Sequence, residues 1–558
     1  MFPDRAAARW FLALLVCAGI LALAQNPSPE VQAKIAPLFQ SARAAEKRAD
    51  WASAAKFYDR ILALDSQIAE IWTNKGLVLY QLAQHSEALA AFSRAASLKP
   101  ALVTPQLFLG IEYVRHGEPE KAIGPLEKVL ALEPQHAQGV TALAEAYTGA
   151  GRFADTVRLY RRILQRDPAM EETWYRLGLT YLKWSEHTAR RLVESPSRSG
   201  YGDLLLAEFE ALAGFREDAE ANYRAAITKL PQAPEPHLAF GQFYLESSPP
   251  QLSAAGRQFA IAKQITPEDR RVTLALVRLA EAKGDAAVDP SLDQAGIQRN
   301  DAAQFIAPAS SAKVSTEENV KLAIRLWNRG DFESALAALK PDSTDPATLY
   351  WLSLTCRELA RQTFEEAVRK NPNSYRAHLL LAEIARAARD LRAARTEFAQ
   401  AAALGSNNAS AQLLYIEFLM SSKEDDEALS VATRAVVNLP GNAELNAALG
   451  KLLLASGRTE EAAVSFRRSL EIDPATPKAH AGLADCYAAA GHLDAAVDEM
   501  KRALPSDMDG TLHYRLGRWY RQMGRDAEAN QAFSETARLK EQVRKAELMH
   551  FSLTHEPR

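Results

Sequence analysis

A spacing of 34 residues between similar side chains constrains this chain of 558 residues more than any other feature. Residues 71–100, IWTNKGLVLYQLAQHSEALAAFSRAASLKP, contain one full unit. Within each half of the unit, apolar positions recur every three or four residues, which is the period of a helix with one buried face. Small Gly76 and Ala88 allow two helices to approach closely, and Pro100 ends the second helix. The unit therefore predicts two short antiparallel helices.

The side chains at the fixed positions of this unit are those of a known repeat. In chain order they are Trp72, Gly76, Tyr80, Ala88, Phe92, Ala95 and Pro100. They resemble the tetratricopeptide repeat, whose pattern is W-x2-L-G-x2-Y, then A-x3-F, then P, on a 34-residue period. The resemblance covers about residues 35–540. It implies an all-α fold, a right-handed solenoid of helix-turn-helix hairpins in two repeat blocks, in which stacked neighbours share a continuous core.

The period fails in the segment 173–198, TWYRLGLTYLKWSEHTARRLVESPSR. Repeats begin at residues 35, 69, 103, 137 and 171, and the next begins at 200, five residues early. Neither Gly nor Pro occurs between Leu179 and Ser195, and one apolar face continues from Trp174 to Leu192. We therefore predict a single fused helix near 172–195 in place of a hairpin.

The same anomaly occurs a second time. Residues 348–383 match residues 173–208 without a gap at 13 of 36 positions. A shared deletion indicates that one supermodule was duplicated, and it predicts a second long helix near 347–370. Two degenerate repeats with tight turns are the alternative. We hypothesise that these helices are junctions that orient neighbouring repeat blocks, although a role as interaction surfaces stays open.

Composition also indicates where the domains of the chain begin and end. Residues 284–315 are rich in Ala, Ser, Asp and Pro and lack helical periodicity, which predicts a linker. This linker separates an N-terminal solenoid, residues 35–283, from a C-terminal solenoid, residues 316–534. The polar residues 25–34 predict a flexible lead-in. Residues 535–552, with apolar side chains on one side and charge on the other, predict a capping helix.

The N-terminus has the features of a secretory signal. Arg5 and Arg9 precede an apolar run over residues 10–24, which ends in the sequence Ala-Leu-Ala. The run has 15 residues, short of the roughly 20 that span a bilayer. We expect residues 1–24 to be cleaved as a signal peptide, and the mature protein to be periplasmic in a bacterium. The alternatives are an uncleaved inner-membrane anchor facing the periplasm, and an extracellular protein.

Motifs of catalysis and cofactor binding are absent from the sequence. It contains no H-E-x-x-H, G-x-S-x-G, phosphate loop or paired C-x2-C, and the repeats leave no room for a catalytic domain. The net charge of −3 gives no whole-molecule reason to propose DNA or RNA as a partner, which would call for a strong positive charge with aromatics. We expect a non-enzymatic protein with no cofactor, no metal site and no nucleic-acid partner.

The resemblance also implies where a partner binds. In tetratricopeptide repeat proteins the first helix of each repeat lines a concave groove, and its second, fifth, ninth and twelfth positions face a ligand. Here the early repeats offer an apolar and aromatic wall at such positions: Leu77, Tyr80, Leu107, Ile111, Val114, Tyr175 and Leu179. This wall suits an amphipathic or extended peptide. Internal packing of some of these side chains is the alternative.

A second candidate surface is a basic stripe near the C-terminus. The last two first helices carry Lys478, Tyr514, Arg515, Arg518 and Arg521. These side chains could hold an acidic peptide or an anionic glycan through charge-assisted hydrogen bonds. The alternative is a stripe that is only solvated.

These features predict a protein-interaction scaffold of the bacterial cell envelope, which binds peptide or protein partners in its concave groove. The alternative function is that of a component of the machinery for envelope polysaccharide synthesis or export, or for outer-membrane assembly. Such a component would contact an acidic glycan or a pore protein. Membrane contact is expected only if the N-terminal segment stays uncleaved.

Overall fold

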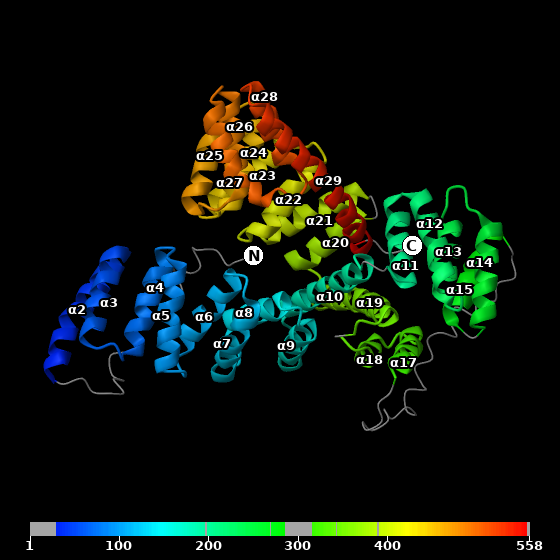
Figure 1. Cartoon of the computed structure of the whole chain (residues 1–558), viewed down its shortest axis with the longest axis horizontal. Coiled ribbons are helices and arrows are strands. Elements are labelled where there is room, and N and C mark those ends of the chain that lie inside the picture. The colour runs from blue at the N-terminus through cyan, green and yellow to red at the C-terminus, as the bar shows by residue number, and fades with distance from the viewer. Residues whose placement is uncertain are drawn as a thin grey trace. The chain divides into compact units, whose positions relative to one another are not determined.

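Paired α-helices make up the described parts of the chain (Figure 1). The structure, a computed structural model, describes residues 29–195, 198–267, 269–284, 315–341, 343–387 and 390–554, and no β-strand occurs in these ranges. The predicted all-α fold of helix-turn-helix repeats is confirmed. The predicted signal peptide, residues 1–24, lies outside the described residues.

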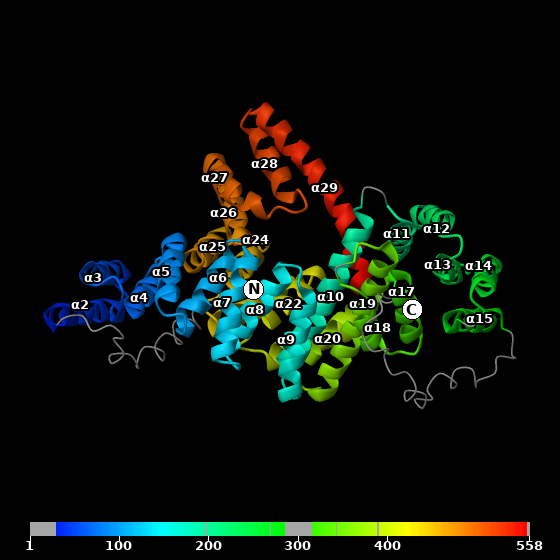
Figure 2. The same cartoon turned by 60° about the horizontal axis from the view of Figure 1, so that its bottom comes forward.

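The chain forms two compact units, with the boundary between Thr180 and Tyr181. In the first unit each helix from α2 to α8 packs against its successor, so that hairpins stack, and Figures 1 and 2 both show the members of each pair side by side. The hairpins are α2 (Pro29–Lys47) with α3 (Trp51–Leu64), α4 (Ala69–Gln81) with α5 (His85–Leu98), α6 (Val103–Arg115) with α7 (Pro119–Leu132), and α8 (Ala137–Gly149) with α9 (Phe153–Arg166).

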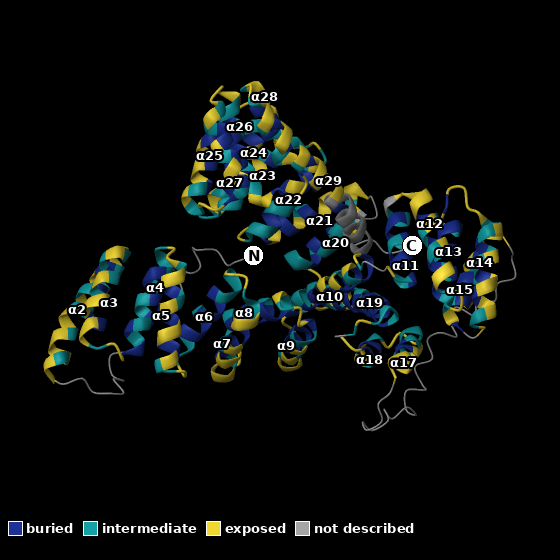
Figure 3. Ribbon diagram, viewed as in Figure 1, coloured by how far each residue is buried: buried dark blue, intermediate teal, exposed yellow. Residues whose placement is uncertain are grey.

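The core of each hairpin depends on a small residue facing a large one. Phe92 on α5 is fully buried, and a Cβ atom added to Gly76 on α4 would lie 2.6 Å from its ring. Figure 3 shows the same distribution along the described helices, with buried residues on the sides where helices face each other. The glycine of the repeat pattern therefore sets how closely the two helices of a hairpin approach.

The turns inside several hairpins use a left-handed backbone conformation. Gly117 and Gly151, 34 residues apart, adopt φ values of 73° and 71° after α6 and α8. Ala83 occupies the corresponding position after α4 with φ 58°. A residue with a Cβ atom is disfavoured there by roughly 1–2 kcal/mol, so this turn is held by the packing of α4 on α5.

The long helix α10 (Glu171–Val193) has 23 residues, and no turn interrupts residues 183–188. Its counterpart α19 (Pro346–Lys370) has 25 residues. One stripe of α10 is buried along its whole length, which is why the chain does not fold back. The stripe consists of Leu177, Tyr181, Trp184, Thr188 and Leu192.

The second unit contains the C-terminal half of α10 and all later helices. Its first hairpins are α11 (Gly200–Ala213) with α12 (Arg216–Lys229) and α13 (Pro234–Leu245) with α14 (Leu252–Ile265), followed by α15 (Arg270–Lys283). Then come α17 (Thr316–Asn328) with the short α18 (Phe332–Ala338), and α19. The remaining hairpins are α20 (Tyr375–Ala387) with α21 (Leu391–Leu404), α22 (Ala409–Ser421) with α23 (Asp425–Asn438), α24 (Ala443–Ala455) with α25 (Thr459–Ile472), α26 (Pro477–Ala489) with α27 (Leu493–Ala503), and α28 (Thr511–Gln522) with α29 (Asp526–Thr554).

The division of the chain differs from the one predicted. We expected separate solenoids over 35–283 and 316–534, joined by a linker at 284–315, of which residues 285–314 lie outside the described residues. Helices from both sides of this linker belong to the second unit. The physical reason is that α19 packs against α11, where the Tyr350 hydroxyl donates to Glu208 Oε1 at 3.1 Å.

Both ends of the repeat array are more helical than predicted. α2 begins at Pro29, inside the segment 25–34 expected to be a flexible lead-in. A proline is tolerated in the first turn because its missing N–H would have no intrahelical partner there. α29 continues through residues 535–552, so the predicted capping helix is the extension of the last repeat helix. No Gly or Pro between Asp526 and Thr554 stops it.

Candidate binding surfaces

The predicted N-terminal wall lies on α4, α6 and α10, and the structure divides it into two classes. Leu107 and Ile111 are buried, with 4% and 8% of their surface exposed, so they contribute to internal packing. The other wall residues keep part of their side chain accessible. These half-buried residues are Leu77, Tyr80, Val114, Tyr175 and Leu179.

Tyr80, the aromatic residue of this wall, is already held by its neighbours. Its ring packs edge-on against Phe108 with the centroids 5.3 Å apart, and Arg115 Nη2 donates to its hydroxyl at 3.1 Å. Arg115 Nε lies 3.4 Å from buried Glu112, whose other oxygen bonds His85 Nδ1 at 3.1 Å. The network pairs the charges of Arg115 and Glu112 with each other, so the wall offers a partner mainly apolar contact.

The predicted basic stripe is partly neutralised by acidic residues on neighbouring first helices. Lys478 Nζ lies 3.2 Å from Glu444 Oε2 and 3.7 Å from Glu417 Oε1. Arg515 forms an ion pair with Asp485 on α26. Burial raises the pKa of the Asp485 carboxyl, and the Arg515 guanidinium opposes that shift. Lys478 and Arg515 are therefore engaged within the chain.

The remaining stripe residues meet two side chains of α29 in what we call the Tyr514 site: Tyr514, Arg518, Arg521, Phe533 and Lys540. The rings of Tyr514 and Phe533 lie 5.7 Å apart. The Arg521 guanidinium lies 4.9 Å from the Phe533 centroid, and Lys540 Nζ lies 5.9 Å from that of Tyr514. Tyr514 is 47% exposed. Within the described residues, none of the three cations of this site is in an ion pair.

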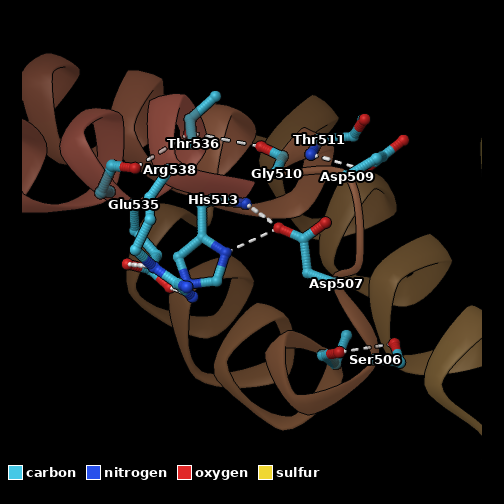
Figure 4. Close-up of polar contacts among 11 residues, drawn as sticks. Ser506, Asp507, Asp509, Gly510, Thr511, His513, Glu535, Thr536 and Arg538 are labelled. Carbon is cyan, nitrogen blue, oxygen red and sulfur yellow. Dashed lines mark hydrogen bonds and ion pairs between the residues drawn. The ribbon is translucent and has the colours of Figure 1, made fainter. Parts of the chain in front are cut away.

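Hydrogen bonds around the start of α28 hold this end of the helix in place and join it to α29 (Figure 4). Asp507 Oδ2 accepts from the His513 backbone N–H at 2.8 Å and from His513 Nδ1 at 2.6 Å. The Thr536 hydroxyl on α29 donates to the Gly510 carbonyl at 3.2 Å. A Cβ atom at Gly510 would lie 2.8 Å from Thr536 O, so glycine permits this approach. α28 and α29 are thereby joined beside the site.

Sequence reasoning missed Phe533 and Lys540. Phe533 occupies the repeat position whose equivalent, Phe92, is fully buried, so the repeat pattern alone does not mark it as a surface residue. It is only half-buried and lines a surface hollow together with Tyr514, Arg518, Arg521 and Gln522. The signal that could have found it is its place in the last repeat, where no later hairpin covers the pair.

Across the ranges that the structure covers, no three His, Cys, Asp or Glu side chains are arranged to hold a metal ion. None of the helices in those ranges is both long and apolar enough to span a bilayer.

Comparison with protein families matches the repeats found above. Two family models, both described as tetratricopeptide repeat, match the chain. One matches residues 39–102, 109–183, 357–403 and 384–443, and the other matches residues 453–516. The matched segments together cover about half of the 558 residues. The chain belongs to the tetratricopeptide repeat family. No curated protein is similar enough in sequence to count as a relative.

Several solved structures resemble this tetratricopeptide repeat protein weakly. The APC/C hetero-tetramer Cut9–Hcn1 is 14% identical, with 93% of this chain and 96% of that chain covered and a TM-score of 0.30. Pseudomonas aeruginosa pilF is 17% identical, with 41% and 97% covered and a TM-score of 0.29. MamA from Desulfovibrio magneticus RS-1 is 18% identical, with 26% and 83% covered and a TM-score of 0.25. Similarities at this level support no statement about partners or function.

Proposed function

We propose that this chain is a non-enzymatic scaffold that binds an acidic peptide segment of a partner protein at the Tyr514 site. Tetratricopeptide repeat proteins bind protein partners, and the chain belongs to that family. One observation supports this particular site. Three cations lie beside the exposed ring of Tyr514, and none of them is in an ion pair within the described structure: Arg518, Arg521 and Lys540.

The chemistry of the site fits a carboxylate-bearing chain. An arginine guanidinium presents a planar fork of N–H donors that matches a carboxylate, and such charge-assisted bonds contribute about 1.5–3 kcal/mol each. The half-exposed Tyr514 ring adds an apolar surface next to them. A peptide with two or three Asp or Glu residues beside an apolar residue would use both features.

An anionic glycan would satisfy the same cations, and it is the second candidate. A sugar ring, however, stacks on an open aromatic face. Here the Arg521 guanidinium lies on the Phe533 ring, and the two aromatic rings are tilted by 54°. Only Tyr514 remains as a platform, so the geometry favours the peptide.

The N-terminal wall is a further candidate surface of the scaffold. Its accessible apolar residues, Leu77, Val114 and Leu179, suit the apolar face of a peptide helix. Because the charges around Tyr80 are satisfied within the chain, binding there should depend little on salt.

We propose that the scaffold is exported to the periplasm of a bacterium after cleavage of residues 1–24. The support is the charged segment with Arg5 and Arg9, the apolar run of 15 residues and the Ala-Leu-Ala sequence before Gln25. N-terminal sequencing of the mature protein tests this. Gln25 as the first residue would support a free periplasmic or secreted protein, whereas Met1 would indicate a membrane-anchored one. A place in envelope polysaccharide export or outer-membrane assembly stays the alternative.

Fluorescence polarisation with the mature full-length protein tests the binding site. The probes are a labelled acidic peptide with one apolar residue, the same peptide with Lys in place of each acidic residue, and an oligosaccharide of uronic acids. We expect the acidic peptide to bind most tightly, and rising salt to weaken its binding. Charge reversal by Arg518→Glu with Arg521→Glu should weaken it at least about tenfold.

The matched control is Arg434→Glu with Arg467→Glu. These two exposed arginines lie on the second helices α23 and α25, so the control changes the net charge equally but leaves the Tyr514 site intact. Equal losses in both double variants would contradict the proposed site. Tighter binding of the oligosaccharide, lost only in the Arg518 and Arg521 variant, would establish the glycan alternative.

A further inference from the structure

The first helices α11, α13 and α15 form a continuous wall within the second unit, because each packs against the next. Tyr201 and Glu208 on α11 are seven residues apart, which is about two helical turns, so they lie on one face. Counted from the repeat start at residue 200, they are the second and ninth positions. Glu235 on α13 is the second position of the next repeat. In this family these positions face a ligand.

This ligand-facing wall is occupied by the start of α19. The rings of Tyr201 and Tyr350 lie 5.2 Å apart, and the Tyr350 hydroxyl donates to Glu208 Oε1 at 3.1 Å. Tyr350 is 4% exposed. One residue of α19 thus contacts two positions of α11 that would otherwise be available to a partner.

The next residue of α19, Trp351, is held by the wall in a different way. Its ring lies 4.8 Å from the Arg271 guanidinium of α15 and packs edge-on against Trp327 of α17 with the centroids 5.6 Å apart, and its side chain is fully buried. Arg271 is itself fixed, since Nη2 lies 3.1 Å from Glu235 Oε1 and 2.5 Å from Asp269 Oδ2. The two carboxylates therefore orient the cation that covers the indole.

We infer that the concave face of α11, α13 and α15 is a helix-binding groove whose occupant is the chain's own α19, anchored by Tyr350 and Trp351. A buried aromatic anchor is a feature by which a groove holds a separate peptide helix, and Tyr350 is such an anchor on α11, while Trp351 beside it lies under Arg271. The contact is therefore a binding interaction between two parts of the chain.

A second contact holds α19 from another side and must be separated from the groove in any test. The Ser185 hydroxyl of α10 donates to Ser353 O at 2.9 Å, and Arg191 Nη2 donates to Ser343 O at 3.0 Å. These bonds leave Tyr350 and Trp351 untouched. Variants at Ser185 and Arg191 are consequently the matched controls for variants in the groove.

The experiment places a protease cleavage sequence between residues 284 and 315 of the full-length chain. After cleavage of the folded protein, we expect the two fragments to elute together in size-exclusion chromatography. Tyr201→Ala with Arg271→Ala should weaken their association by at least about tenfold on dilution, and Ser185→Ala with Arg191→Ala should weaken it less. Fragments that separate without any substitution would overturn the inference, as would release only by the Ser185 and Arg191 variant.

Hydrogen exchange on the uncut chain distinguishes a local release of α19 from a general loss of fold in the groove variant. If the inference holds, Tyr201→Ala with Arg271→Ala speeds amide exchange in the first turns of α19 and leaves α4 and α24 unchanged. Unchanged exchange in α19 would contradict it. Faster exchange throughout the second unit, α24 included, would also contradict it, because the substituted residues would then maintain the fold of the unit and would not serve one separable contact.

Discussion

Ser185 and Ser353 lie with their hydroxyl oxygens 2.9 Å apart, although 168 positions separate them in the sequence. The Ser185 hydroxyl donates to Ser353 O at 2.9 Å, and the Ser353 hydroxyl lies 3.2 Å from Ser185 O. Both side chains are buried. Small hydroxyl residues at this point let the two long helices α10 and α19 approach closely while their polar atoms stay paired.

This contact predicts a dependence of stability on side-chain size. Ser185→Ala removes one hydrogen bond and should lower the free energy of unfolding by about 1 kcal/mol. Ser185→Leu must also displace α19, which adds roughly 1–3 kcal/mol. Urea unfolding followed by circular dichroism measures both variants. Equal stabilities for Ala and Leu at this position would show that α10 and α19 are not in contact in solution.

The left-handed turn residues predict a stabilising substitution. Ala83 adopts φ 58°, where glycine is favoured, so Ala83→Gly should raise the free energy of unfolding by about 1 kcal/mol. The control is Ala150→Gly, because Ala150 has φ −80° and gains nothing from glycine. Thermal unfolding compares the two. A gain from Ala150→Gly that equals the gain from Ala83→Gly would contradict the assigned turn.

The close approach of Gly450 to Phe466 predicts a size limit inside a hairpin. A Cβ atom at Gly450 would lie 2.8 Å from the Phe466 ring, so Gly450→Val should destabilise the protein by about 1–3 kcal/mol through overpacking. Shortening the opposing side chain in the double variant Gly450→Val with Phe466→Leu should recover part of that loss. Urea unfolding of these two variants and of Phe466→Leu alone measures the coupling, and losses that simply add would argue against direct contact.

Glu208 predicts a change of stability with pH. Burial raises the pKa of its carboxyl, although Arg357 and the hydrogen bond from Tyr350 oppose the shift. Below the ordinary glutamate pKa of about 4.3 the group is protonated in both states, and as pH rises the unfolded state loses its proton first. The free energy of unfolding should therefore fall as pH rises from about 4.3 to the raised pKa.

The matched variant for this pH effect is Glu208→Gln, which keeps an oxygen to accept from Tyr350 but cannot ionise. Subtracting its free energy of unfolding from that of the unsubstituted protein, across a pH series, isolates the contribution of Glu208. We expect this difference to decline with rising pH and then level off. A difference that rises with pH would mean that the pKa is lowered in the folded protein.

The hairpins could be predicted from the sequence because their determinants are local. Gly76 and Phe92 are 16 residues apart, and the same pair of positions recurs with the repeat period. The sequence pattern alone therefore predicts that a small residue on the first helix faces a large one on the second. The contact of Tyr350 with Glu208 spans 142 residues and belongs to no period. It depends on how α19 lies against α11, which a repeat pattern does not encode.

The sequence could predict which helices carry the candidate sites, but not which of their side chains are free to bind a partner. Arg515 and Arg518 lie on the same helix, but of the two only Arg515 forms an ion pair among the described residues, with the Asp485 carboxylate 30 residues away. Likewise Leu107 and Ile111 share the wall pattern with Val114 and yet are buried. Side-chain pairing and burial are decided by neighbouring repeats, so the pattern identifies candidates without separating free residues from engaged ones.

The most direct measurement reverses the charge of the Tyr514 site and, separately, the charge of its peptide ligand. The acidic peptide and its Lys-substituted form are each titrated against the unsubstituted protein and against Arg518→Glu with Arg521→Glu. We predict that the unsubstituted protein prefers the acidic peptide and that the double variant prefers the basic one. If the double variant still prefers the acidic peptide with unchanged affinity, the partner does not bind at this site.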